Sequence, residues 1–182
     1  MTNSQQQDLS LTDKQLVRGC LENNRLMQRA LYERYSSKLY TLIYRLISNR
    51  SSSNDVLQDA FIEIFRSLAT FRFESSLYSW MRTIAVRNAL GYLKKNARLQ
   101  FSTNELPDLP SDSSYSFSAG DIEKAILSLP EQARSVFILI EVEGYKHQEV
   151  ARILNIHEGT SKSQLNYAKK LLRKRLTNLT DE

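Results

Sequence analysis

Helical periodicity runs through almost the whole sequence, and one polar stretch interrupts it. Apolar residues recur every three or four positions from Leu11 to Asn96 and again from Ala119 to Leu179, which is typical of amphipathic helices. Residues 97–118 lack this pattern, are polar and acidic, and contain two of the three prolines. Such a segment buries too little apolar surface to order itself. The chain is therefore predicted to be all-α, with two small helical domains joined by a flexible linker.

The expected boundaries follow from this pattern. A flexible N-terminus (1–10) precedes a first domain (11–96), a linker (97–118) and a second domain (119–179). The first domain is predicted to contain five helices, at 13–23, 24–35, 37–47, 54–68 and from Ser75 or Ser76 to residue 96. Thr12 and Gln15 have the spacing of a capping box for the first helix. The second domain is predicted to contain four, at 121–129, 130–141, 147–154 and 160–176, with Pro130 in a first helical position.

Composition narrows the class of protein. A net charge of +5 and a pI of about 9.3 favour an anionic partner. The single cysteine, Cys20, fits a reducing cytosol and a small place in a helix core. There is no signal peptide and no apolar run of roughly 18 residues, so a cytoplasmic protein is expected. No glycine-rich phosphate loop, metal-ligand set or nucleophile with its base is visible, which predicts no cofactor, no metal and no enzymatic activity.

Three surfaces are candidates for function, and the first lies on the helix expected at 54–68. Asp55, Gln58, Asp59 and Ile62 share one face, with Glu63 beside them. An apolar residue among carboxylates is unusual on an outer face. From this segment alone an ordinary solvated face is the favoured interpretation, and a protein contact is the alternative.

The second surface combines cations with aromatic rings. Trp80, Thr83 and Arg87 lie on one face of the helix that follows the loop containing Arg72 and Phe73. Phosphates pair with cations and unstacked bases lie on aromatic faces, so this mixture indicates single-stranded nucleic acid. A core position for Trp80 is the alternative.

The third surface has a helix-turn-helix pattern centred on Asn155, which tolerates a left-handed turn. The groups at 160–164 are expected to be exposed at the start of the last helix and within reach of a DNA major groove. Further along, a basic run begins at Lys169. His147 is expected to be a helix cap or a residue close to DNA.

The order of these segments resembles the sigma factors of bacterial RNA polymerase. Residues 54–65 are similar to their polymerase-binding helix and residues 71–85 to their segment for the proximal promoter box. Residues 129–145, 149–151 and 159–163 are similar to their C-terminal DNA-binding domain. Only the second and fourth sigma domains are present, as in the extracytoplasmic-function (ECF) group.

The resemblance implies a role for each surface. Asp55, Gln58, Asp59 and Ile62 would bind the core polymerase. The proximal box would be melted and held by a set from the loop and the helix after it: Arg72, Phe73, Ser75, Ser76, Trp80, Thr83, Arg87 and Asn88. The distal box would be recognised by a set from the last two helices: His147, Thr160, Ser161, Lys162, Ser163, Gln164 and Lys169.

Some features depart from the family or lie beyond it. Asn155, Ser161 and Gln164 stand where the family often has glycine, an aliphatic residue and arginine, and Ser161 is expected to loosen the packing of its helix. The family commonly works under an anti-sigma factor, often a membrane protein. A stand-alone helix-turn-helix regulator with a sensing or dimerising first domain is the alternative, and an enzyme acting on nucleic acid is a more distant one. Promoter sequence, target genes and inducing signal are not encoded in any recognisable way.

Overall fold

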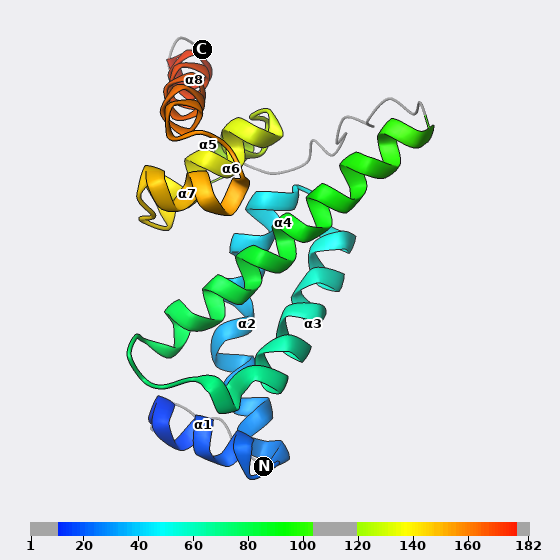
Figure 1. Cartoon of the computed structure of the whole chain (residues 1–182), viewed down its shortest axis with the longest axis vertical. Helices are drawn as coiled ribbons and strands as arrows, with labels where there is room; N and C mark the ends of the chain where they lie inside the picture. Colours follow the sequence, from blue (N-terminus) through cyan, green and yellow to red (C-terminus); the bar gives the residue numbers. More distant parts are fainter. Residues whose placement is uncertain (1–10, 104–119, 178–182) are drawn as a thin grey trace. The chain divides into compact units, whose positions relative to one another are not determined.

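The computed structural model of the chain describes residues 11–103 and 120–177. Within these ranges every regular element is helical, which confirms the predicted all-α class (Figure 1). The elements are α1 (Asp13–Leu21), α2 (Arg25–Ile47), α3 (Arg50–Ser67), a 3₁₀ turn η1 (Leu68–Thr70), α4 (Leu77–Thr103), α5 (Gly120–Leu127), α6 (Glu131–Phe137), a π-helical turn η2 (Ile138–Val142), α7 (His147–Leu154) and α8 (Glu158–Thr177).

The backbone divides into two compact units. The first comprises residues 1–43 and 51–89, and the second comprises residues 44–50 and 90–182. Helices α2 and α4 therefore contribute to both. The predicted N-terminal segment and residues 104–118 of the predicted linker lie outside the described residues.

The first unit is held together by one apolar core. Its largest fully buried side chains come from all four helices and from η1, and include Leu16, Leu31, Ile64, Leu68 and Met81. Cys20 is 6% exposed, as predicted for a small core residue, and burial raises the pKa of its thiol to about 11. Gly19 allows α1 to approach α2, because a Cβ there would lie 2.3 Å from Cγ of Met27.

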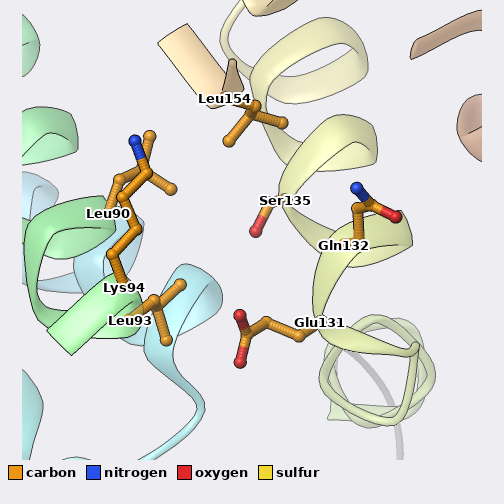
Figure 2. Close-up of a pocket in the computed structure, with 7 residues that line it drawn as sticks. All are labelled: Leu90, Leu93, Lys94, Glu131, Gln132, Ser135 and Leu154. Atoms are coloured by element: carbon orange, nitrogen blue, oxygen red, sulfur yellow. The ribbon is translucent and has the colours of Figure 1, made fainter. Parts of the chain in front are cut away.

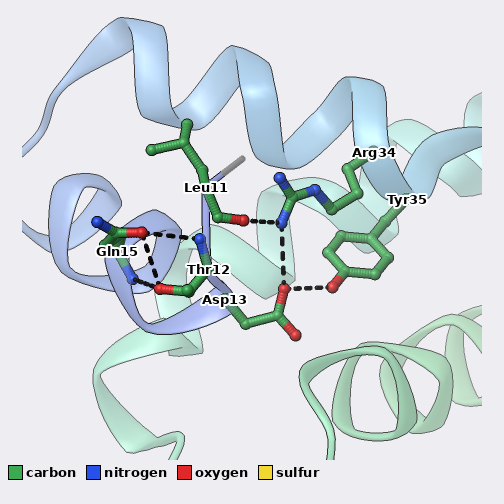
Figure 3. Close-up of polar contacts among 6 residues, drawn as sticks. All are labelled: Leu11, Thr12, Asp13, Gln15, Arg34 and Tyr35. Carbon is green, nitrogen blue, oxygen red and sulfur yellow. Dashed lines mark hydrogen bonds and ion pairs between the residues drawn. The ribbon is translucent and has the colours of Figure 1, made fainter. Parts of the chain in front are cut away.

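Polar contacts fix the start of α1 against α2 (Figure 3). The predicted capping box is present: the Gln15 N–H donates to the Thr12 hydroxyl (3.3 Å), and the Thr12 N–H donates to the Gln15 side chain (2.8 Å). Arg34 donates to the carbonyl of Leu11 (2.7 Å), and the Tyr35 hydroxyl donates to Asp13 (2.6 Å). Burial and then the hydrogen bond to Asp13 raise the pKa of Tyr35 to about 12.

The largest differences from the predicted helix boundaries in this part of the chain are three, and the other ends shift by at most two residues. The expected break near Ser37 is wrong, because buried Tyr35 and Leu39 continue one apolar face through α2. Helix α3 begins at Arg50 rather than Asn54, since left-handed Ser48 (φ 62°) already makes the turn. Helix α4 continues seven residues beyond Asn96, to Thr103. The added sequence contains Ala, Arg, Leu and Gln, which are good helix formers.

The second unit contains helices α5 to α8, whose buried residues include Ile126, Val136, Leu139, Val150 and Leu165. Pro130 is the N-cap of α6 rather than its first residue, and the helix expected to reach Glu141 changes at Ile138 into the π-helical turn η2. Asn155 adopts the predicted left-handed conformation (φ 54°, ψ 51°) between α7 and α8.

Arg134 is the most buried charge described in the chain. Its side chain is 7% exposed and donates to the carbonyls of Leu127 and Leu129, both at 3.0 Å. These carbonyls lie where α5 ends, so the guanidinium satisfies backbone acceptors that the helix leaves unpaired. Desolvation lowers the pKa of Arg134.

Candidate nucleic-acid and partner interfaces

The outer face of α3 is exposed as predicted. Asp55, Gln58, Asp59 and Ile62 are all exposed, and Ile62 is 48% exposed. The other side of the helix is buried through Val56, Leu57, Ala60, Phe61 and Ile64. Phe61 also packs on Tyr32 of α2, with ring centroids 4.6 Å apart. The rigid packing of one side thus presents the four candidate residues on the other.

A stack of three aromatic rings lies at the start of α4. Phe71 is 8% exposed and lies between Phe73 and Trp80, with centroid distances of 4.6 and 5.3 Å. Phe73 is 45% exposed, and the ammonium group of Lys14 lies 6.0 Å from its centroid. Trp80 is half-buried and packs against Phe71, so it is partly a core residue, and its contact with nucleic acid stays a prediction.

The backbone of Phe73 is strained. Its φ of 59° lies in the left-handed region, which bulky side chains rarely adopt. Such strain costs on the order of 1–3 kcal/mol and persists where surrounding contacts enforce it. Here the Phe71 ring and Lys14 hold the Phe73 ring on the outside of the loop. Sequence analysis missed Phe71 and Lys14 as the supports of this site.

The remaining proximal-box candidates lie on the loop and on α4. Arg72, Ser75, Ser76, Thr83 and Arg87 are exposed, and Asn88 is half-buried. Ser76 caps α4, because its hydroxyl accepts a hydrogen bond from the N–H of Ser79 (3.1 Å). This cap and the contact of Phe71 with Trp80 join the loop to the start of α4.

A carboxylate of α3 contacts this surface. Glu63 forms an ion pair with Arg87, and its other oxygen accepts a hydrogen bond from the Asn88 amide at 2.7 Å. The sequence placed Glu63 beside the exposed face of α3. Its contacts with Arg87 and Asn88 could not be predicted from helical spacing, because these residues follow it by 24 and 25 positions.

In the second unit, the expectation that Ser161 is exposed is wrong. Ser161 is 0% exposed, and its hydroxyl lies 2.9 Å from Nδ1 of His147. A side chain without accessible surface offers DNA no contact, so a direct DNA role for Ser161 is withdrawn. The expected loosening does not follow either, since His147 satisfies the buried hydroxyl and joins α7 to α8.

The other distal-box candidates lie at or near the surface. Lys162 and Ser163 are exposed, and Thr160, Gln164, Lys169 and His147 are half-buried. Helix α8 begins at Glu158, two residues earlier than predicted, so Thr160 lies inside its first turn. Two of the cations are ion-paired: Lys162 with Glu158 (2.7 Å) and Lys169 with Glu141 (2.8 Å). The pair with Lys162 lowers the pKa of Glu158.

A hollow of about 190 Å³ lies within the second unit (Figure 2). Leu90, Leu93 and Lys94 line one side of it, and Glu131, Gln132, Ser135 and Leu154 line the other. None of them is a predicted site residue. In the described ranges, no three His, Cys, Asp or Glu side chains gather as metal ligands. Over the same residues, no helix is long and apolar enough to cross a bilayer.

Comparison with known families decides between the two interpretations of the sequence. Residues 31–99 match the family model for sigma-70 region 2, and residues 119–172 match the model for sigma-70 region 4. The chain belongs to the sigma-70 family. The match to region 2 favours a sigma factor over a stand-alone helix-turn-helix regulator, whose first domain would have no reason to resemble it.

Curated relatives place this sigma factor in the ECF group. It is 28% identical over 186 residues to the ECF RNA polymerase sigma-E factor of Haemophilus influenzae, covering 91% of this chain and 96% of the relative. It is 28% identical over 182 residues to the sigma-E factor of Escherichia coli K12, covering 89% and 93%. The alignments run across both domains, so the function of the group applies: the chain directs promoter-specific initiation by RNA polymerase.

Solved structures share the fold of this sigma factor. The sigma factor RpoE of Bartonella quintana, in complex with the anti-sigma factor NepR, matches with a TM-score of 0.58 and 22% identity, covering 82% of this chain and 96% of that one. CnrH, in complex with the cytosolic domain of CnrY, matches with a TM-score of 0.54 and 17% identity, covering 91% and 97%.

Proposed function

We propose that this sigma factor divides its work among the three surfaces described above. The face of α3 formed by Asp55, Gln58, Asp59 and Ile62 binds core RNA polymerase. The aromatic stack and α4 hold the unpaired strand of the proximal promoter box. The accessible residues near the start of α8, Thr160, Lys162, Ser163 and Gln164, recognise the distal box. No step of this proposal requires catalysis by the chain, and it acts in the cytoplasm, where the core polymerase is.

The observation that carries the proposal is the aromatic stack. Phe73 is strained and exposed, its ring packs on Phe71, and the ammonium group of Lys14 lies near it. Backbone strain of this kind is concentrated at functional sites, where surrounding contacts enforce it. A flat, π-faced ligand such as an unpaired base fits the exposed ring, and Arg72 beside the ring supplies charge for the adjacent phosphate.

The sigma factor is also proposed to have an anti-sigma partner. The two solved structures described above are complexes, one with the anti-sigma factor NepR and one with the cytosolic domain of CnrY. The exposed face of α3 and the basic surface of α8 are the parts that such a partner would need to cover. Whether the partner is anchored in a membrane is a separate property of that protein.

Replacing Phe73 by Ala tests the DNA role of the stack. Loss of one base–aromatic contact costs about 1–3 kcal/mol, so affinity for a fluorescein-labelled single-stranded 20-mer is expected to fall at least fivefold in an anisotropy titration. Folding should suffer little, because the ring is 45% exposed and lies outside the core. Tyr167, 47% exposed on α8, provides the matched control: Tyr167→Ala should leave single-strand affinity within twofold. Unchanged affinity in Phe73→Ala would contradict the assignment.

A further inference from the structure

Both carboxylate oxygens of Glu63 contact side chains of α4. Oε1 forms an ion pair with Arg87, whose side chain is 67% exposed, while that of Glu63 is 37% exposed. Oε2 accepts from Nδ2 of Asn88 at 2.7 Å. The two partners are adjacent in sequence, and both belong to the surface proposed to hold the unpaired promoter strand. One carboxylate of α3 therefore controls two candidate DNA contacts at once.

The contact has a different effect on each partner. The Asn88 amide donates to Glu63 and also to the carbonyl of Ile84 (2.9 Å), so both of its N–H groups are engaged. The side-chain carbonyl oxygen of Asn88 is still available, and such an oxygen accepts hydrogen bonds from the amino groups of bases. Arg87 is affected in the opposite way, since its charge is neutralised by a carboxylate of the same chain.

We propose that Glu63 is a positioning residue that orients Asn88 and competes with DNA phosphate for Arg87. The inference rests on the proposed DNA role of the α4 surface. When a strand binds, the guanidinium exchanges the carboxylate for a phosphate, while Asn88 keeps its orientation. Because exposed ion pairs are weak, Glu63 lowers single-strand affinity by a modest factor and does not block binding.

A double-mutant cycle tests the competition. The full chain carrying Glu63→Gln, Arg87→Gln or both is titrated against a fluorescein-labelled single-stranded 20-mer of mixed sequence, at KCl concentrations between 50 and 200 mM. Glutamine removes the charge of residue 63 but keeps an oxygen that accepts from Asn88. Glu63→Gln is expected to bind two- to fivefold tighter than the natural chain. Arg87→Gln should bind more weakly, and the double variant should match Arg87→Gln.

Two readouts separate competition from other effects. Loss of the Arg87–phosphate contact in Arg87→Gln should lower the slope of log Kd against log [KCl] by about 0.7, whereas Glu63→Gln should not lower it. Glu33→Gln removes the same charge from the exposed pair with Arg29, and this control should leave the affinity unchanged within the scatter of the titration. Thermal unfolding followed by circular dichroism should be the same for all four chains of the cycle.

The outcomes distinguish this inference from the proposed function. If Arg87→Gln weakens binding but Glu63→Gln does not tighten it, the competition is overturned while the DNA role of α4 stands. If Glu63→Gln tightens binding equally with and without Arg87, the effect is long-range charge and the competition is again overturned. If neither Arg87→Gln nor Phe73→Ala alters affinity, the DNA role of this surface fails and the inference fails with it.

Discussion

Replacing Asp55 and Gln58 by Ala together should weaken binding to core RNA polymerase by about 10- to 100-fold. Truncating a charged and a polar group at the centre of an interface commonly costs several kcal/mol, because their partners are left desolvated and unpaired. Both side chains are exposed in the chain by itself, so the fold should lose almost nothing. The measurement is a competition titration against a labelled natural chain for a fixed amount of core enzyme.

The control for this variant removes an acid from another exposed site. Glu22 follows the last residue of α1 and pairs with Arg18, with its side chain 62% exposed. Glu22→Ala should compete for core enzyme as well as the natural chain does. Equal competition by the Asp55→Ala/Gln58→Ala variant would show that the polymerase binds elsewhere and that the exposed face of α3 is only solvated.

Replacing Arg134 by Ala should destabilise the second unit by about 3 kcal/mol. The substitution removes a buried side chain and leaves the carbonyls of Leu127 and Leu129 without their donor. An unsatisfied buried acceptor costs about 1–3 kcal/mol, and the space left by the side chain adds to this. Helix α6 packs on α8. Destabilising α6 should therefore also destabilise α8, the helix proposed to contact the distal box.

Native-state hydrogen exchange measures this effect most directly. Amides of α6 and α8 should exchange about 100-fold faster in Arg134→Ala, since a decade in the opening constant corresponds to about 1.4 kcal/mol. Arg152→Ala in α7, an exposed position, should leave those amides unchanged. Protection of α6 and α8 at the natural level in Arg134→Ala would mean that the buried guanidinium contributes no net stability.

The elements that were predicted best are those determined by residues close together in the sequence. The capping box of α1, the bounds of α7 and the left-handed turn at Asn155 each depend on residues within four positions of one another. The break expected in α2 failed for the opposite reason. One helix was predicted to end at Tyr35 and the next to begin at Ser37, but Tyr35 and Leu39 on either side are buried, and that packing overrides the weak helix propensity of serine.

For the candidate sites, too, local spacing predicted some features, while contacts between helices could not be predicted. Helical spacing was enough to predict the exposed face of α3, because the buried stripe opposite it determines which side is outward. It was not enough for Ser161, which has the polarity of a surface residue but lies where α7 and α8 meet and is satisfied by His147. The contacts of Glu63 with Arg87 and Asn88 join different helices, and no spacing rule relates them.

Ion pairs inside the chain also reduce the positive charge that some of its candidate DNA-binding residues present. Arg87, Lys162 and Lys169 each face a carboxylate of the same molecule. These three side chains therefore offer less positive charge than their residue types suggest, as long as the carboxylates stay paired with them. This agrees with a protein that engages promoters as part of a larger assembly, where other contacts contribute to affinity.

The most direct test of the central claim is transcription in vitro from fragmented genomic DNA. Core RNA polymerase is incubated with the natural chain or the Asp55→Ala/Gln58→Ala variant, or without either, and the 5′ ends of the transcripts are mapped. The account predicts discrete start sites with the natural chain, none with core enzyme alone, and a loss of at least tenfold with the variant. Absence of discrete starts with the natural chain, while it still binds DNA, would contradict the account.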